Sequence, residues 1–595
     1  MIALSCVFLH SPQAHSNSID LRLPMIVNPA TLNQIQEELR RDSAINFISG
    51  GSIWIDGTKL NIENHELKGE GIQIQIGGKT FRSFHLNFNA QSTSSGGGFL
   101  EIGSLTGHGK GSIALVSSGK RDAVFLVNGD LTASGAAMNI SLENLGTDSS
   151  AKLVVSKRVL LGSGSRVTLH GRSLMTITES FTANIGSGIL SLSEGGESDS
   201  LVVGGDFIFS NTNSLNAEVN PDLRLDASII KSSAKIGGNF VLNGVSNSPS
   251  SYLQISETEG SGFRASAIYV NAAKNNSTSL VLGHGARIAS SSGFINLTAE
   301  EKGSQANLFI GDSSGRPSAI DAALINMNSV QNQGDVCVVL SNNAGSLKDG
   351  FDFSSKITGW GQVENRKGIN SLTNAQNDYS GTTVVSSGLL RLTSPKTVGS
   401  SRITVNSSPE DESQGLVLDY HEEETPLSNE LSGSGVIIVS DYAVVKSEKA
   451  ENFFGKWNVL GTLKLGEGAV DSAQSLGNGT SQIGSNGKII ISDNSKEAKF
   501  IFRTRLIGDG TLDVHFAGNG NSSDLYTPTF EIETGKGADF EGTINLEGAS
   551  AGNKVKYVLN SNELKNASFK VGENSILSIG HELSLIHISE PTRLR

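Results

Sequence analysis

A nearly constant repeat in the C-terminal part of the chain limits the fold more than any other feature. The segment Tyr379 to Thr382 places an aromatic residue two positions before a glycine. The same arrangement returns at Phe453 to Lys456 and, after a somewhat longer interval, at Phe540 to Thr543. A repeat of roughly 74 residues predicts a stack of similar structural units rather than one globular core.

A glycine motif precedes each aromatic residue. Its copies, Ile357 to Gly361, Leu431 to Gly435 and Leu506 to Gly510, begin at almost equal intervals. The aromatic residue follows at the same distance in the first two copies and later in the third, where Gly518 to Asp524 has the composition of an inserted loop. A fixed period that tolerates insertions is typical of a solenoid.

A unit of roughly 74 residues is too long for one coil of a solenoid and suits about three coils of roughly 25 residues. Parallel strands of successive coils would bond to each other and enclose a narrow apolar core. We therefore expect Tyr379 and Phe453 to occupy equivalent positions three coils apart.

Composition agrees with many short strands joined by tight turns, since the chain has 69 glycines and 11 prolines and its aromatic residues (24 Phe, 7 Tyr and 3 Trp) make up only 6% of 595 residues. A net charge of −13 without a basic stripe argues against a nucleic-acid partner. Cys337 lies in an apolar run, where a buried inert thiol is expected. No apolar run reaches the roughly 20 residues of a transmembrane helix.

The N-terminus has the pattern of a signal peptide over residues 1–16, with an apolar run from Ile2 to Leu9 and small residues at Ala14 to Ser16. The basic residues that usually begin such a peptide are missing, so a buried strand is the alternative. Residues 17–44 are expected to form an N-terminal cap. Its helix would begin at Asn28 and Pro29 and cover the open end of the solenoid; a partner-binding helix is the alternative.

From residue 45 onward apolar and polar residues alternate, most clearly in Ile72 to Ile76 and Leu190 to Ser193. We divide this part into an irregular solenoid, residues 45–345, and a regular repeat region, residues 346–580. Related glycine turns recur in the chain. One family comprises Val127–Leu131, Val203–Phe207 and Ile236–Phe240, and another comprises Leu161–Gly164, Leu282–Gly285 and Leu465–Gly468.

The repeat region resembles the autotransporter-associated β-strand repeat of bacterial outer-membrane autotransporters. The resemblance rests on Tyr379 to Thr383, the strand Gly388 to Leu392, and Ser475 to Gly477 before Gly487 to Ile491, and it covers about residues 357–580. It implies a right-handed parallel β-helix that is exported through the periplasm and displayed on the cell surface or secreted, often for adhesion. It also implies an outer-membrane β-barrel translocator as partner, although no barrel sequence follows the repeats.

The last residues, 584–595, abandon the alternation and resemble translated sequencing-adapter sequence, so they are left out of the fold.

One motif suggests a protease. Gly311 to Gly315 is close to the sequence around the serine nucleophile of chymotrypsin-like enzymes, with Ser313 as the nucleophile. A serine stands where the following glycine should be, and the histidines lack the context of a general base. Because Leu308 to Gly311 also aligns with Leu280 to Gly283 as a strand and corner, we interpret Ser313 as a turn residue.

Three segments suggest metal binding without the required spacing. The run His421 to Glu424 lacks the second histidine of a metalloprotease helix and ends at Pro426, as a solvated loop would. His581 and His587 fail the same test, and Gly518 to Asp524 is only a distant likeness of a calcium-binding nonapeptide. We therefore assign no metal, cofactor or catalytic residue.

The expected function is a non-catalytic adhesin or structural rod that binds host or neighbouring-cell glycans or proteins. A polysaccharide lyase or hydrolase is the alternative, because parallel β-helices also support such sites, but sequence does not show which carboxylates stack. Two departures from the repeat, Pro409 to Pro426 and Gly518 to Thr529 with Tyr526, are the candidate ligand contacts. They are equally well interpreted as loops without a function.

Overall fold

The computed structural model describes individual strands in the N-terminal part and long continuous stretches further on. The described residues are 18–21, 25–27, 44–47, 51–55, 66–69, 72–76, 79–81, 84–90, 98–102, 105–107, 111–117, 122–133, 137–144, 150–186, 188–193, 200–212, 228–256, 262–299, 301–312, 315–329, 334–421, 425–465, 476–493, 499–516, 529–533, 535–547, 555–559, 564–573 and 575–579.

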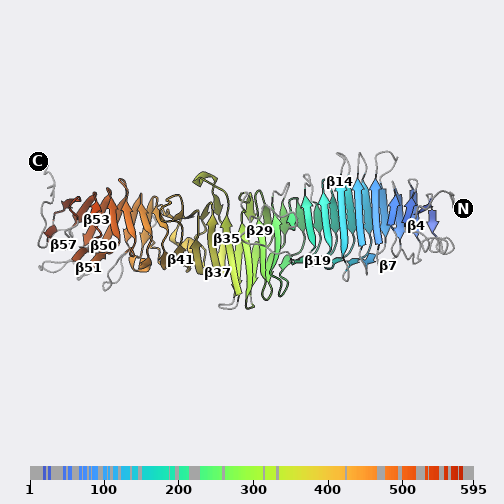
Figure 1. Ribbon diagram of the computed structural model, residues 1–595, viewed down its shortest axis with the longest axis horizontal. Coiled ribbons are helices and arrows are strands. Elements are labelled where there is room, and N and C mark those ends of the chain that lie inside the picture. The colour runs from blue at the N-terminus through green and yellow to red at the C-terminus, as the bar shows by residue number, and fades with distance from the viewer. Residues whose placement is uncertain are drawn as a thin grey trace. The chain divides into compact units, whose positions relative to one another are not determined.

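The chain divides into two compact units, residues 1–337 and 338–595, and the boundary falls within β35 (Gly334–Ser341). In each unit, strands pair in parallel with the strand one coil before and one coil after, as the stacked arrows of Figure 1 show. The predicted all-β fold, a parallel β-helix, is therefore confirmed. The expected helix at residues 28–39, the leader at 1–16 and the tail at 584–595 lie outside the described residues.

Each coil of unit 1 contributes one strand to each of three parallel ladders. One such coil contains β28 (Ile268–Ala272), β29 (Ser277–Leu282) and β30 (Arg287–Ser290). β29 pairs with β26 (Ser250–Ile255) before it and with β32 (Ser304–Ile310) after it. Coil lengths differ because the corners, and not the strands, accept extra residues.

Alternating burial along the strands builds the core of unit 1. In β15 (Ala151–Val155) every second side chain is buried, as the period of two requires. Phe181, Phe207 and Phe240 stand in register in three successive coils. The rings of the first two stack with centroids 4.7 Å apart, and the next pair is separated by 5.4 Å. A column of aromatic rings therefore runs through the core, an arrangement that favours one register.

The first family of glycine turns forms one corner of the solenoid. The turn Val203–Phe207 joins β21 (Leu201–Val203) to β22 (Phe207–Asn211), and Ile236–Phe240 joins β24 (Ala234–Ile236) to β25 (Phe240–Asn243) in the next coil. Gly237 N donates to the carbonyl of Val203 at 2.7 Å. The second family is not one corner, because Leu161 ends β16 (Val159–Leu161) and Leu282 ends β29, which belong to different ladders.

The strand pairing of unit 2 shows which residues of the sequence repeat occupy equivalent positions in successive coils. Its relevant ladder contains β37 (Lys356–Lys367), β39 (Ser380–Val385), β41 (Arg402–Val405), β43 (Leu431–Gly433) and β46 (Asn452–Phe453). Within it Val385 pairs with Val405, Val405 with Gly433, and Gly433 with Phe453. Three coils are confirmed, but the coil between Val405 and Gly433 is longer than the coil on either side of it. The predicted equivalence of Tyr379 and Phe453 is wrong in register, since Phe453 stands in line with Val385.

The immediate surroundings of the repeated aromatic residues are nevertheless alike. Gly359, Gly433 and Gly508 all have positive φ, at 92°, 101° and 100°. The residue after the aromatic donates its N–H to the motif glycine one coil earlier in the second and third copies, at 2.8 Å and 2.9 Å. A left-handed backbone angle at each glycine explains why this position is repeated in the sequence.

Two further predictions from the sequence, one strand and one buried residue, are confirmed. The alternating segment Ile72–Ile76 is the strand β6, as predicted. Cys337 is buried, as its apolar surroundings indicated.

Candidate functional site

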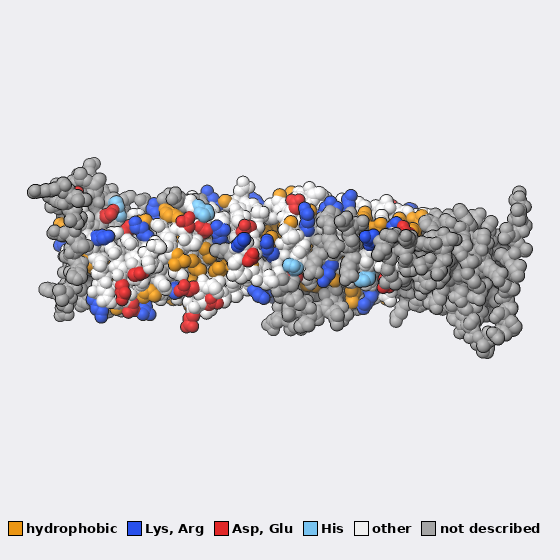
Figure 2. Space-filling model, turned by 90° about the horizontal axis from the view of Figure 1, so that it is seen from above, with side chains coloured by type: hydrophobic (Ala, Val, Ile, Leu, Met, Phe, Trp, Pro, Cys, Tyr) orange, Lys and Arg blue, Asp and Glu red, His pale blue; other side chains and the backbone are white. Residues whose placement is uncertain are grey.

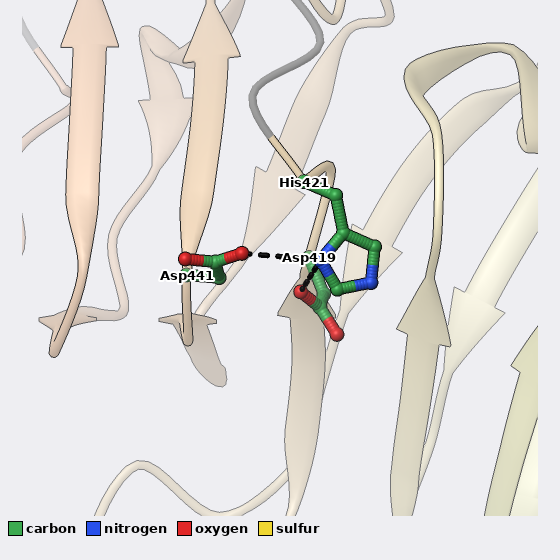
Figure 3. Close-up of side chains that lie close together, drawn as sticks. All are labelled: Asp419, His421 and Asp441. Atoms are coloured by element: carbon green, nitrogen blue, oxygen red, sulfur yellow. Dashed lines mark hydrogen bonds and ion pairs between the residues drawn. The ribbon is translucent and has the colours of Figure 1, made fainter.

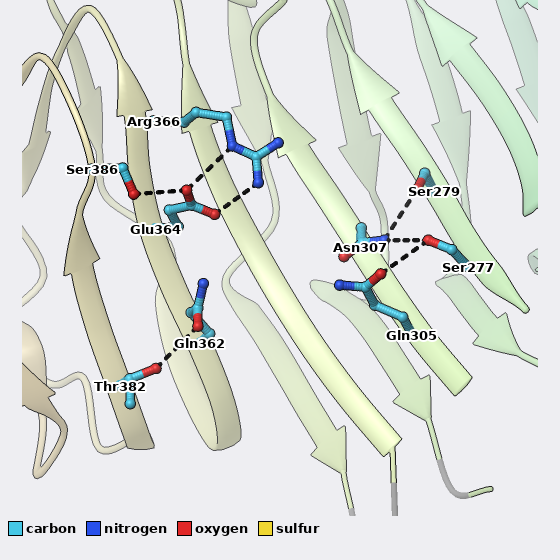
Figure 4. A network of polar contacts seen from close by, with 9 residues as sticks. All are labelled: Ser277, Ser279, Gln305, Asn307, Gln362, Glu364, Arg366, Thr382 and Ser386. Atoms are coloured by element: carbon cyan, nitrogen blue, oxygen red, sulfur yellow. Dashed lines mark hydrogen bonds and ion pairs between the residues drawn. The ribbon is translucent and has the colours of Figure 1, made fainter. Parts of the chain in front are cut away.

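A network of polar side chains covers the outward face of β37 and β39 (Figure 4). Residues of β37 alternate, so that Val363 and Asn365 are fully buried whereas Gln362 and Arg366 face outward. Thr382 Oγ1 donates to Gln362 Oε1 at 3.3 Å, and Ser386 Oγ donates to Glu364 Oε1 at 2.9 Å. These bonds join adjacent coils and hold the side chains in one orientation.

Glu364 is the most buried charged group of this face. Its carboxylate accepts two hydrogen bonds from Arg366, from Nε at 3.2 Å and from Nη2 at 2.8 Å. Burial acts to raise the pKa of Glu364, but the hydrogen bonds and charge of Arg366, together with hydrogen bonds from Ser386 and Gln362, outweigh it and hold the pKa below its usual value. Glu364 is therefore a paired carboxylate and lacks the character of a general acid.

A polar network in unit 1, in which Ser279 and Asn307 are buried, also bonds from coil to coil. Asn307 Nδ2 donates to Ser277 Oγ at 3.0 Å and to Ser279 Oγ at 3.2 Å, while Ser277 Oγ donates to Gln305 Oε1 (Figure 4). On another ladder Asn271 Nδ2 donates to Asn243 Oδ1 at 3.0 Å. Amide and hydroxyl groups thus bond from coil to coil on both units.

One cluster has the residue types of a metal or acid–base site (Figure 3). His421 Nδ1 lies 3.1 Å from an oxygen of Asp441 and 3.7 Å from an oxygen of Asp419. Asp419 follows β42 (Gly415–Leu418), and Asp441 precedes β45 (Tyr442–Val445) one coil later. His421 has a positive φ of 45°, which turns its ring back toward the two carboxylates.

Arg391 already engages the buried member of this cluster. Its Nε donates to Asp419 Oδ2 at 2.8 Å, and its Nη2 lies 2.6 Å from the same oxygen. The side chain of Asp441, in contrast, is 57% exposed. Two acidic groups and a histidine are an incomplete ligand set when one acid already has a cationic partner, so we assign no ion to them.

The described residues of the protease motif form a turn. Leu280 and Leu282 pair with Leu308 and Ile310, which confirms that the two segments are the same strand and corner in successive coils. Asp312 N donates to the carbonyl of Gly315 at 2.9 Å, and Gly315 N donates to Asp312 Oδ1 at 3.0 Å. The chain thus turns back on itself here, and Ser313 itself lies outside the described residues.

The first predicted ligand loop, Pro409 to Pro426, is a loop only in part: residues 409–414 form exposed or half-exposed turns, whereas residues 415–420 are buried. It contains β42, all four residues of which are buried, and Tyr420, which is 2% exposed. The exposed residue Glu412 is also held, because it pairs with Lys456 and accepts a bond from Asn458 Nδ2 at 3.1 Å. An acidic run follows these apolar residues directly, and it led to the prediction of a surface loop for the whole segment.

The remaining candidates are only partly described. Glu422 to Glu424 and residues 518–528 with Tyr526 lie outside the described residues, as do His581 and His587. His421, predicted to lie in a solvated loop, faces Asp441. Their separation of 20 residues, the length of one coil, is the only sequence signal from which this contact could have been predicted.

On the face shown in Figure 2, acidic and basic side chains of the described residues are intermingled. Several pairs bridge adjacent coils, among them Asp130 with Arg158 and Asp122 with Lys152. Within the described part of the chain, no helix is both long and apolar enough to cross a membrane. Comparison with known proteins finds no matching family model, no matching curated protein and no matching solved structure.

Proposed function

We propose that the chain is an exported, non-catalytic surface protein that acts in adhesion or as a structural scaffold, of the kind that its autotransporter-like repeat suggests. One observation supports this proposal above the others: the outward side chains of β37 and β39 are fixed by bonds between coils. A face that is already ordered loses little conformational entropy when a ligand binds.

The pairing of charges supports the same function. Glu364, Asp130 and Asp122 each have a basic partner, which leaves them as components of a rigid surface. Ligands of the proposed protein are glycans or proteins on a host or neighbouring cell. Affinity would come from several weak contacts along one face.

The test is adhesion of particles that carry the folded chain. Beads coated with the full chain should adhere to cultured cells, and soluble chain added in excess should prevent this. Beads coated with the heat-unfolded chain are the control. Adhesion no greater than that of the control beads would contradict the proposed function.

The second candidate function is a glycan-active enzyme, and the cluster of Asp419, His421 and Asp441 favours it. Retaining glycosidases place two carboxyl groups about 5–5.5 Å apart, and one carboxylate oxygen of Asp419 lies within 4.8 Å of one carboxylate oxygen of Asp441. Such enzymes also shield the acid group from water, whereas Asp441 is mostly exposed. Release of reducing sugar from a polysaccharide by the full chain, abolished by Asp441→Asn, would favour the enzyme over the adhesin.

A further inference from the structure

Trp360 stands on the same outward face of β37 as the polar network. Its side chain is 39% exposed, and it is one of five large apolar residues that are exposed in the described part of the chain. Gln362 follows it on the same face, and Ser380 pairs with it in the next coil. An exposed indole therefore borders directly on amide and hydroxyl groups.

This combination suits a sugar better than a protein. The centre of a protein interface is apolar around its aromatic anchor, whereas the groups around Trp360 are polar. A pyranose ring has the complementary form, with an apolar C–H face that packs on the electron-rich face of an aromatic ring and a rim of hydroxyl groups that needs hydrogen-bond partners. Gln362 and Thr382 supply such partners, already oriented toward each other at 3.3 Å.

The charges on this face favour an uncharged ligand. Arg366 is paired with Glu364 at 2.8 Å, and Arg402 on β41 is paired with Glu430 at 3.2 Å. An acidic sugar would have to compete with these carboxylates for the guanidinium groups. A neutral sugar would leave both pairs intact.

We propose that the outward face of β37 and β39 binds a neutral oligosaccharide, with Trp360 stacked against one sugar ring and Gln362 and Thr382 bonded to its hydroxyl groups. This inference rests on the proposed function and names the class of ligand. The proposed site lies on the face of a sheet, so the ligand includes internal segments of longer glycans.

The test measures binding of glycans to the full chain, first on an array and then by titration. The array carries neutral oligosaccharides of glucose, galactose, mannose and N-acetylglucosamine beside sialylated and sulfated glycans. Trp360→Ala should weaken binding of the selected oligosaccharide at least about tenfold, because a tryptophan at the centre of a site typically contributes that much or more. Trp360→Phe keeps an aromatic face and should remain within a few-fold of the wild type. Phe454→Ala, which removes a side chain that is 60% exposed elsewhere on unit 2, is the matched control and should bind normally.

Two outcomes would overturn the inference. One is an array in which only sialylated or sulfated glycans bind, or none; the other is a Trp360→Ala chain that binds as the wild type does while its melting temperature is unchanged. In either case, adhesion of chain-coated beads would still support the proposed function. If the beads fail to adhere although the chain still binds the oligosaccharide, the result contradicts the proposed adhesin function and supports the proposed sugar site.

Discussion

Phe453 stands in line with Val385, which lies three coils earlier on the same parallel ladder. Val385 lies six residues after Tyr379, the counterpart of Phe453 in the sequence repeat. The third copy repeats the offset. Gly508 stands in line with Ile483, Val459 and Val439, although its counterpart in the second copy is Gly433. The sequence repeat is therefore six residues longer than the three coils it occupies.

Tyr379 is expected to make unit 2 sensitive to alkali. Burial raises the pKa of its phenol to about 12 from 10.0, although hydrogen bonds with Thr383 and Ser401 act in the opposite direction. The neutral phenol is thus favoured in the folded state. This contribution to stability is complete below pH 10 and is lost as the pH rises through about 12, a total loss of about 3 kcal/mol.

The variant Tyr379→Phe separates this effect from the titration of other groups. At neutral pH it should unfold about 1 kcal/mol more easily, because it loses the 2.6 Å bond between Tyr379 and Thr383. Near pH 12 the order should invert, since phenylalanine cannot ionise. Denaturant unfolding at pH 7, 10 and 11.5 measures both; an unchanged difference across this range would contradict the predicted pKa.

Asn377 is expected to stabilise three successive coils at once. Its Oδ1 accepts from Ile357 N at 2.8 Å, and its Nδ2 donates to the carbonyl of Thr397 at 2.6 Å. Asn377→Ala leaves both backbone groups buried without this partner, and should cost about 1–3 kcal/mol in the free energy of unfolding. Asn374→Ala is the control, because Asn374 bonds at the exposed surface, and it should cost less than about 1 kcal/mol.

Gly433 should not tolerate a side chain. Its φ is +101°, and a Cβ there would lie 2.2 Å from the carbonyl oxygen of Val405 in the preceding coil. Gly433→Ala is therefore expected to lower the free energy of unfolding by at least about 1–3 kcal/mol. Gly345→Ala has open space and should be neutral or slightly stabilising. Equal melting temperatures for the two variants would show that the coils separate more easily than the ladder suggests.

Deletion of Pro409 to Pro426 should unfold unit 2, contrary to the expectation for a surface loop. The deletion removes β42 and interrupts the ladder between β40 (Leu389–Leu392) and β44 (Val436–Val439). Glu412→Ala, by contrast, removes a partly exposed ion pair with Lys456 and should cost about 1 kcal/mol or less. Circular dichroism and thermal unfolding distinguish the two. Retention of native β-sheet content by the deletion would contradict this assignment.

Periodicity in the sequence was sufficient to predict the fold. Alternation predicted β6 and the corner motif predicted the stacking of Leu280 on Leu308, because both depend on residues close in the chain or one coil apart. The register of the repeat was predicted wrongly. An equal division of the repeat gives three coils of about 25 residues, whereas the coils from Val385 to Phe453 are 20, 28 and 20 residues long. These lengths depend on how each corner folds, which the spacing of the repeat does not show.

The candidate sites were harder to predict than the fold. Trp360 belongs to the glycine motif, so its place in a repeat concealed that its side chain points outward. His421 and Asp441 are 20 residues apart, and only the coil length shows that they meet. Sequence arguments about loops favoured polar runs, whereas the ordered polar surfaces lie on strands.

The six-residue offset also affects how such a chain could grow. Gly433 and Phe453 belong to one ladder of unit 2, while Gly508 and Phe540 belong to another. Duplication of a repeat therefore does not place its new copy directly above the old one: each added copy carries the aromatic motif part of a turn further around the axis. Lengthening by whole repeats would change both the reach of the molecule and the side on which each copy faces its surroundings, so a straight ligand would meet a different chemical surface at every copy.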